Sequence, residues 1–549
     1  MLRRSGLIGA LRLVRQLLDG RRRAETLGEL RRLRRLRRDL GGSLARPSRP
    51  PEQRVLVIGL ASLREITLQM PLITAFRSAG YRPVVVLHSR APILQAAYRA
   101  IGVDRFAFYE DHMPARPGAP DITPDTTLEE LLGLAHQGVT IGRYAISRLM
   151  RWTRNGDPDI AGRHRGLARA AIAEAMAYAE AARAILAAHR PDAALFLDHG
   201  YSPDGQLFDL VLDGGGACYT WNAAHRDGML MLKRYGLENR DVHPSSLSPS
   251  TWRRLRDMRW SDRHWETLRR EIEECYVSGE WYGEVGTQYR KRFPEPRALK
   301  VELGLDPGKK TAVIFPHIFW DATFFWGVDH FRNYEEWFVE SLKAACRNDR
   351  LNWIVKIHPG NLVKDRRDGF QGEHSEITAI REAVGELPPH VRLIDASADI
   401  GSLSLYHVLD YCVTVRGTVG IEAACFGKRV ITAGTGRYDR LGFTEDPDSA
   451  EAYLDILSRL ETLAPPDAAE TELARRYAYG VFIARPTPLN SVAFAYAQDS
   501  AASLNVDLRA RGGALWAADD VAAMAGWIAG GEVDFLREGA LADPVDGGA

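Results

Sequence analysis

The chain has 549 residues, of which 45% are hydrophobic and 26% charged, with a formal net charge of +1 at pH 7. That length is too great for one ordinary core and indicates two domains with extensions. The near-neutral charge argues against a protein devoted to nucleic acid. The five cysteines include no C-x-x-C pair, which favours a reducing compartment without a disulfide framework or a zinc site. No run reaches about 18 apolar residues, so we expect a cytoplasmic protein without a membrane span.

Residues 1–50 are set apart by their arginines. The first forty positions hold thirteen arginines and no lysine. Apolar residues recur at helical spacing over the first twenty positions, and Leu30, Leu33 and Leu36 continue a narrower stripe. A basic amphipathic helix suits an anionic bilayer, so we expect an anionic membrane surface as a partner, with the protein peripheral on the inner membrane. A solvated, partly disordered arm fits the same residues equally well. Residues 46–52 indicate a linker.

A first α/β domain with a connector at its end is expected over residues 51–300. Residues 54–60 form a short apolar run that is typical of a buried parallel strand. The loop that follows leads into a helix whose first turn carries Glu65. This acid is a candidate catalytic base. It is equally well explained as a first-turn acid that the helix dipole stabilises by about 0.3–1 kcal/mol.

Polar residues follow two later strands of this domain. Residues 193–197 end in Asp198 and His199, and residues 217–221 lead towards His225. Ligands of open α/β sheets bind beyond the carboxyl ends of the strands, so we expect an acceptor site here, with Asp198 and His199 as further candidate bases. Each histidine also has an explanation as a surface or cap residue.

A second α/β domain is expected over residues 301–465, beginning with a strand at 311–315. A later strand, 353–357, runs into the sequence Lys356-Ile357-His358-Pro359. Pro359 fixes a turn, and Lys356 or His358 can meet a phosphate group. Residues 466–549 are expected to form a helical extension and tail, from which a helix returns to the first domain.

The stretch from residue 409 to residue 444 carries the strongest signal. It predicts a strand at 413–415, a turn at Arg416-Gly417-Thr418, a helix at 419–426 and a strand at 429–432. A helix N-terminus at the end of a parallel strand binds phosphate, and Glu422, one turn into the helix, could reach a ribose. An ordinary βαβ unit, with Thr418 as N-cap and Glu422 as a solvated acid, is the alternative.

The order of residues in this stretch resembles a known family. The pattern G-T-V-G-I-E-A-x-x-x-G-K-x-V-I, followed by Gly434, Tyr438 and Gly442-Phe443-Thr444, is similar to the nucleotide-sugar segment of the capsule polysaccharide biosynthesis family. That family contains two-domain glycosyltransferases of the GT-B type, including Kdo transferases. Where its members often carry Asn-Ser before the threonine, this chain has Arg416-Gly417. The Lys-x-His-Pro motif recurs in the same family and in glycerophosphate-polymer transferases.

The resemblance implies an α/β fold with two Rossmann-like domains facing across a cleft. It also implies a substrate-binding set, which is Lys356, His358, Arg416, Gly417, Thr418, Glu422 and Tyr438. The spacing of Ser62-Leu63-x-Glu65 is similar to the first turn of bacterial heptosyltransferases, in which the acid lies between donor and acceptor.

We therefore expect a glycosyltransferase that moves a sugar from a nucleotide-sugar donor to a surface glycan or glycolipid acceptor. It would need neither a metal nor a cofactor beyond the nucleotide-sugar co-substrate, since helix termini and basic side chains can hold the leaving phosphate. The same scaffold suits a sugar-nucleotide 2-epimerase or a polyol-phosphate transferase. A non-catalytic scaffold in polysaccharide export is an alternative from another class.

Overall fold

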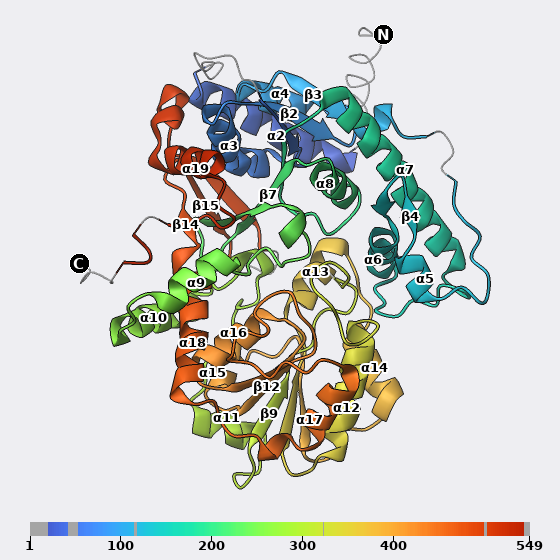
Figure 1. Ribbon diagram of the computed structural model, residues 1–549, viewed down its shortest axis with the longest axis vertical. Coiled ribbons are helices and arrows are strands. Elements are labelled where there is room, and N and C mark those ends of the chain that lie inside the picture. The colour runs from blue at the N-terminus through green and yellow to red at the C-terminus, as the bar shows by residue number, and fades with distance from the viewer. Residues whose placement is uncertain are drawn as a thin grey trace.

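A computed structural model describes residues 20–41, 53–114, 118–321, 323–498, 502–537 and 539–542. The chain forms two α/β domains, each built on one sheet, which lie in the upper and lower halves of Figure 1. This confirms the predicted class, in which two Rossmann-like domains face one another. No helix among the described residues combines the length and apolar character needed to cross a bilayer.

Domain one contains a seven-stranded sheet in the order β14-β8-β7-β6-β1-β2-β3. Its strands are β1 (Gln53–Ile58), β2 (Tyr81–Leu87), β3 (Arg105–Phe108), β6 (Ala193–Phe196), β7 (Ala217–Ala223), β8 (Met229–Tyr235) and β14 (Thr487–Pro488). The run β3-β2-β1-β6-β7 is parallel, while β8 is antiparallel to β7 and to β14. The order of strands reverses between β1 and β6, which makes the carboxyl ends of these two strands a switch point for ligand binding.

Helices cover both faces of this sheet. On one face, α3 (Leu63–Ser78), α4 (Pro92–Ala100) and α19 (Asp519–Gly530) share a hydrophobic core. On the other face lie α6 (Gly142–Thr153), α7 (Arg165–His189) and α8 (Asp204–Asp213). The shorter elements of this domain are η1 (Tyr109–Asp111), α5 (Leu128–Leu132), β4 (Ala135–His136) and β5 (Val139–Thr140).

Helix α2 (Gly20–Asp39) packs on α4 and α3 at the same end of domain one (Figure 1). Leu33, Leu36 and Leu40 are buried in the core there, with exposed fractions of 7%, 6% and 2%. The leucine stripe that suggested lipid contact is therefore packed against protein at Leu33 and Leu36, because the apolar faces of α3 and α4 complement it. The helix expected over the first twenty residues falls almost wholly outside the described residues, and the linker at 46–52 lies outside them.

A connector joins the two domains. It contains η2 (Leu237–Asn239), α9 (Pro249–Asp257), α10 (Asp262–Ser278), the single turn η3 (Gly283–Val285) and α11 (Pro296–Glu302). Trp281, which precedes η3, is 2% exposed and stacks on Tyr276 of α10. This packing anchors the turn between the domains.

Domain two contains a parallel sheet in the order β11-β10-β9-β12-β13. Its strands are β9 (Thr311–Ile314), β10 (Asn352–Lys356), β11 (Val391–Ile394), β12 (Tyr411–Thr414) and β13 (Arg429–Thr432). Its helices are α12 (Tyr334–Arg347), α13 (Gly360–Asp368), α14 (Ser375–Val384), α15 (Ser402–Tyr406), α16 (Thr418–Cys425) and α17 (Ala450–Ser458), followed by η4 (Leu460–Thr462). The order reverses between β9 and β12, so the loops after these strands form the switch point of this domain.

The chain then returns to domain one. Helix α18 (Ala468–Tyr479) packs on α16 and α10, and a π-helical turn, η5 (Gly480–Ala484), leads into β14. Arg485 is fully buried and donates hydrogen bonds to the carbonyl oxygens of Pro244, Ser246 and Leu232 at 2.8–2.9 Å. The segment expected as a helical extension also contains the antiparallel pair β15 (Val492–Tyr496) and β16 (Leu504–Leu508), then η6 (Gly512–Ala517) and α19.

Candidate active site between the two domains

A cavity of about 510 Å³ lies between the domains, where the carboxyl ends of the two sheets face each other. Domain one contributes Asp198 and His199, which follow β6. Domain two contributes the residues after β9, β10 and β12, together with Arg437, which lies in the loop beyond β13. Since both switch points open on this space, it is the place in the fold where a ligand can touch both domains.

The N-terminus of α16 faces this cavity, as the sequence pattern predicts for a βαβ unit. Gly417 is the N-cap, not Thr418, because the extended backbone ends at Gly417 (φ −62°, ψ 151°). No side chain caps this helix, which leaves its first-turn N–H groups for a ligand. Tyr438 donates a hydrogen bond of 2.8 Å to the Gly417 carbonyl oxygen and is 2% exposed. Tyr438 thus supports the turn from behind and does not line the cavity.

Two arginines lie at this turn, and they differ in their hydrogen-bond and ion-pair partners. Arg416 is 3% exposed, and its guanidinium forms an ion pair with Asp329. Arg437, which the sequence analysis did not single out, donates hydrogen bonds of 2.8 Å to Thr418 Oγ1 and to Ser245 Oγ in the segment after β8. Arg437 Nη1 also donates to the Arg416 carbonyl oxygen at 3.0 Å, and within the described residues its Nε has no partner. Since these three acceptors are neutral oxygens, the side chain brings a positive charge to the helix N-terminus. Gly434 and Gly436 form a glycine-rich loop just before Arg437, and this loop lies near the N-terminus of α16. That loop was the sequence signal that could have identified Arg437.

Lys356 and His358 face the cavity from the end of β10. Lys356 is 3% exposed, and its Nζ has no hydrogen-bond partner among the described residues. Burial, and then the positive charge of Lys291, lower the pKa of Lys356 to about 7. His358 Nδ1 accepts the Gly360 N–H at 3.0 Å, which leaves the proton of the neutral ring on Nε2. Burial, and then the charges of two lysines, lower the pKa of His358 to about 4.

His317 is a further cavity residue; it belongs to a loop that the sequence places at the cleft, but it was not singled out as a site residue. It follows β9, and its ring stacks on Tyr334 with centroids 4.5 Å apart. The backbone N–H of Arg416 donates to His317 Nε2 at 3.4 Å, so His317 joins the loops of β9 and β12 at the switch point. A histidine after the first strand of a domain gives little signal without knowledge of the strand order.

Glu422 is buried inside the wall of the cavity. It is 1% exposed, accepts a hydrogen bond from Tyr406 at 2.8 Å and accepts a second from Tyr276. Burial raises the pKa of Glu422 to about 7, against the effect of these two hydroxyl donors. Any contact of Glu422 with a ribose would have to share the carboxylate with two tyrosines.

The three expected bases lie in different surroundings. Asp198 lines the cavity, and burial raises its pKa. His199 also lines it, but its ring stacks flat on Phe208 at 3.9 Å and burial lowers its pKa to about 4. Glu65 is the third residue of α3 and forms a capping box with Ser62, whose backbone N–H donates to Oε2 at 3.1 Å. Glu65 lies outside the cavity lining, while its charge still acts on Glu284, which lines the cavity.

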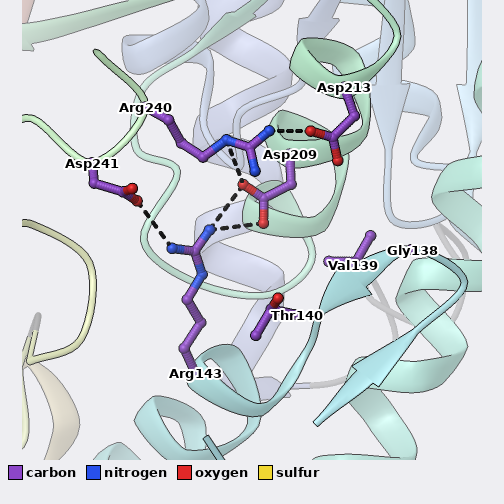
Figure 2. A pocket seen from close by; sticks show the side chains of 8 residues that line it. All are labelled: Gly138, Val139, Thr140, Arg143, Asp209, Asp213, Arg240 and Asp241. Atoms are coloured by element: carbon purple, nitrogen blue, oxygen red, sulfur yellow. Dashed lines mark hydrogen bonds and ion pairs between the residues drawn. The ribbon is translucent and has the colours of Figure 1, made fainter. Parts of the chain in front are cut away.

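An ionic cluster on domain one fills a second, smaller cavity of about 250 Å³ (Figure 2). Arg143 donates to both carboxylate oxygens of Asp209 at 2.8–2.9 Å and pairs with Asp241 at 3.3 Å. Arg240 pairs with Asp213 across the same cluster. Each arginine of this cluster is paired with aspartates, and the ion pairs join α6, α8 and the loop after β8, which is a structural role.

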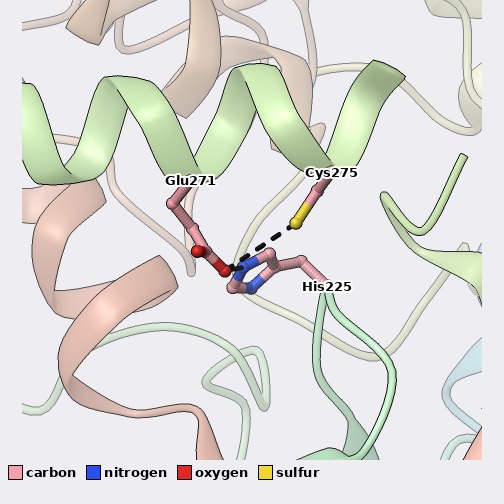
Figure 3. A group of neighbouring side chains, drawn as sticks. All are labelled: His225, Glu271 and Cys275. Carbon is pink, nitrogen blue, oxygen red and sulfur yellow. Dashed lines mark hydrogen bonds and ion pairs between the residues drawn. The ribbon is translucent and has the colours of Figure 1, made fainter. Parts of the chain in front are cut away.

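His225, Glu271 and Cys275 form a close group that could hold a metal ion by geometry (Figure 3). His225 Nε2 lies 2.8 Å from Glu271 Oε1. The guanidinium of Arg226 lies against two of these side chains, at 2.9 Å from Glu271 Oε2 and 3.1 Å from Cys275 Sγ. A fixed positive charge in contact with two of the three ligands disfavours a cation, so the group fastens the end of β7 to α10.

No protein-family model matches the chain, and no curated protein matches it in sequence. Among solved structures it is similar to the Thermosulfurimonas dismutans KpsC beta Kdo 2,4 transferase, with 14% identity and a TM-score of 0.34 over 55% of this chain and 82% of that one. It is also similar to the spinosyn rhamnosyltransferase SpnG, with 12% identity and a TM-score of 0.26 over 78% and 96%. A third similar structure is the UDP-GlcNAc 2-epimerase of Neisseria meningitidis bound to UDP-GlcNAc, with 9% identity and a TM-score of 0.27 over 78% of this chain and 96% of that one. Similarities this weak carry no weight for activity, and the fold rests on the two sheets described above.

Proposed function

We propose that this chain is a glycosyltransferase of the GT-B type that takes a sugar from a nucleotide-sugar donor and passes it to a surface glycan or glycolipid acceptor. One observation carries the proposal: Lys356, His358 and Arg437 meet the uncapped N-terminus of α16 in the cavity between the domains. Cationic groups and helix N–H groups that lack protein partners are the features that bind phosphate.

The donor phosphate would lie on the turn of Gly417 and Thr418. Arg437 is held there by Thr418 and adds a charge whose Nε has no partner. His358 Nε2–H is a neutral donor, and Lys356 gains a proton when an anion arrives. These groups stabilise the negative charge that develops on the leaving phosphate, in a site that needs no metal for the step.

The aromatic connector supplies the wall beside α16. Tyr276, Trp281 and Tyr282 line the cavity next to Glu422. We place the nucleoside against these rings, because flat apolar surfaces with a few polar groups are typical of nucleotide sites. The acceptor would enter from domain one, past Asp198 and His199.

The decisive experiment incubates the protein with UDP-, GDP-, dTDP- and CMP-sugars and measures released nucleotide and sugar product. Release that requires a glycan acceptor supports a transferase. An isomerised nucleotide sugar without any acceptor would show the 2-epimerase instead, and a phosphodiester product would show the polyol-phosphate transferase. Absence of both binding and turnover would favour the non-catalytic scaffold.

Membrane attachment of this enzyme is a separate proposal. Arg31, Arg34 and Arg37 are exposed on α2, while its leucines pack inward. An exposed arginine row on a helix that is fixed to domain one would hold the acceptor side of the enzyme near anionic lipid. This fits a cytoplasmic protein that is peripheral on the inner membrane.

A further inference from the structure

Four carboxylates line the cavity between the domains, and three of them have hydrogen-bond partners in the protein. Glu422 and Asp321 accept hydrogen bonds from tyrosine hydroxyl groups, and Asp198 accepts one from a backbone N–H at 2.9 Å. Glu284 is the fourth. Within the part of the chain that the structure describes, no hydrogen bond or ion pair reaches its carboxylate, which is exposed to the water of the cavity.

Glu284 lies in the middle of the single turn η3 and has a fixed position. Tyr282 (φ +50°) and Gly286 (φ +62°) flank the turn in left-handed conformations. A left-handed tyrosine is uncommon and persists only where its surroundings impose it. Here the Tyr282 N–H donates to the His225 carbonyl oxygen at 2.8 Å. The carboxylate therefore projects from a rigid turn.

The same turn lies against the groups assigned to the donor phosphate. Val285 packs on the turn after β10, since a Cβ placed on Gly360 would lie 3.2 Å from Val285 Cγ1. Tyr282 lines the same cavity as Thr418 at the start of α16. Asp198 of domain one is close enough to Glu284 to act on its charge. Glu284 is thus placed between the leaving-group side and the acceptor side of the cavity.

We propose that Glu284 is a catalytic residue that takes the proton from the hydroxyl group attacking the donor sugar. This inference rests on the proposed function. In the step, the acceptor oxygen bonds to the anomeric carbon as its proton passes to the Glu284 carboxylate. The bond from that carbon to the phosphate oxygen breaks, and its electron pair leaves on the phosphate held at α16. Glu284 ends as a neutral carboxylic acid.

The charges around Glu284 suit this role. The Glu284 side chain opens on the cavity, but the two domains enclose it and reduce its contact with bulk water. This loss of solvation, and then the negative charges of Asp198 and Glu65, raise the pKa of Glu284 to about 7. A general base is most effective when its pKa lies near the working pH. Asp198 and Glu65, two of the expected bases, therefore raise the pKa of a third carboxylate, which the sequence analysis passed over.

Other ionisable groups also face this part of the cavity. Tyr496 of β15 and Asp227 lie beside the turn. The cavity is also lined by basic side chains, which are those of His199, His243, His317, Lys356, His358, Lys364, Arg416 and Arg437. The negative charge of a bound nucleotide would offset the positive charge of these side chains and so change the electrostatic field at Glu284. The pH dependence attributed to Glu284 must therefore be measured with the donor present.

The test compares the parent with Glu284→Gln, which keeps the shape and removes the basicity. UDP and CMP binding is measured by calorimetry, and nucleotide release is measured from the four nucleotide-sugar classes with water or methyl glycosides as acceptors. We expect unchanged nucleotide affinity and turnover that is slower by roughly 10²–10⁴-fold. The rise of parental turnover through about pH 7 should disappear in the variant. Glu284→Asp should retain part of the activity. Glu532→Gln is the control, since Glu532 lies at an exposed site outside the cavity, and it should retain all of the activity.

A Glu284→Gln variant that turns over within a few-fold of the parent, with the same pH profile, would overturn the inference. A parent protein that binds no nucleotide would overturn the proposed function itself. That failure is seen in the parent alone, so it is distinguishable from failure of the Glu284 inference, which is seen only in the comparison with the variant. If the parent binds nucleotide but releases none, difference infrared spectroscopy against Glu284→Gln titrates the carboxyl group directly. A midpoint near pH 7 supports the inference, while a midpoint near the ordinary value of about 4.3 contradicts it.

Discussion

Tyr201 of domain one donates a hydrogen bond of 2.7 Å to Asp321 of domain two at the edge of the cavity. Lys364 forms an ion pair with the other oxygen of Asp321, and this charge lowers the pKa of Asp321 to about 2 against the effect of burial. Arg154 reaches Asp365 across the same boundary at 2.5 Å. These polar contacts hold the domains together at this edge, and Ile318, Trp320 and Phe325 of domain two also pack into the hydrophobic core of domain one. A ligand could reinforce or release this closed arrangement.

Tyr201→Phe should loosen this closed arrangement. The lost hydrogen bond to a charged carboxylate is worth roughly 1.5–3 kcal/mol. We expect a larger radius of gyration in small-angle scattering and a higher KM for the donor. Tyr109→Phe is the matched control, because the Tyr109 hydroxyl is buried without a partner among the described residues. Scattering curves of Tyr201→Phe that superimpose on the parent, with and without UDP, would refute a closing role.

Lys356→Met should stabilise the protein while weakening nucleotide binding. The pKa of Lys356 in the folded state is about 7, below its unfolded value of about 10.4. Between these values the unfolded chain binds a proton that the folded chain lacks, so stability rises with pH across that window and is lowest below about pH 7. Removing the buried amine should raise the free energy of unfolding at pH 7 by roughly 2–4 kcal/mol.

Urea denaturation at pH 6, 8 and 10 checks the stability effect of Lys356→Met, and calorimetry with UDP and CMP checks binding. Lys343→Met on α12 is the control, since Lys343 lies at the surface and pairs with Glu340 at 2.8 Å. A Lys356→Met protein that is less stable than the parent and binds nucleotide equally well would identify Lys356 as a structural residue.

His358→Ala and Glu422→Ala should separate a ligand contact from a structural support. Loss of the His358 Nε2–H donor should weaken nucleotide binding by roughly 10–100-fold with little change in Tm, a loss of about 1.5–3 kcal/mol. Glu422→Ala leaves the buried hydroxyl groups of Tyr276 and Tyr406 without their acceptor, so the free energy of unfolding should fall by roughly 2–4 kcal/mol. Equal Tm values for the two variants would contradict this division.

The sequence predicted those elements of domain two whose signals are local, and it did not predict α13, α14 or α17. The strand, turn and helix around Arg416, Gly417 and Thr418 follow from an apolar run, a break and a second apolar run. The N-cap was displaced by one residue, because capping depends on the backbone angles of Gly417 and not on the chemistry of the Thr418 side chain. Local patterns thus located the side of the cavity to which we assign the donor phosphate.

Residues brought together by topology were not predictable in this way. Glu284 lies in a charged and aromatic connector, on a turn flanked by the left-handed residues Tyr282 and Gly286, and it lines the cavity. Arg437 reaches Ser245 over 192 positions of sequence. The leucines of α2 look lipid-facing in the sequence, because the surface that covers them comes from α3 and α4. No local pattern carries such information.

The proposed membrane contact can be tested without truncation. Deleting α2 would expose the core around Leu33 and Leu36, so a shortened protein would lose stability as well as arginines. The double variant Arg34→Glu and Arg37→Glu changes exposed side chains only. Each basic residue near an anionic surface contributes about 1 kcal/mol, so binding to liposomes that contain phosphatidylserine or cardiolipin should fall at least roughly 30-fold.

The control for this variant is Arg253→Glu with Arg254→Glu, which makes the same charge change at exposed positions of α9. It should bind liposomes like the parent, because α9 belongs to the connector and lies away from α2 (Figure 1). Parental binding should also weaken between 50 mM and 500 mM salt, since screening shortens the reach of surface charges. If both double variants lose binding equally, attraction depends on net charge alone and α2 has no special part. Binding that ignores salt would rule out the arginines as the attachment.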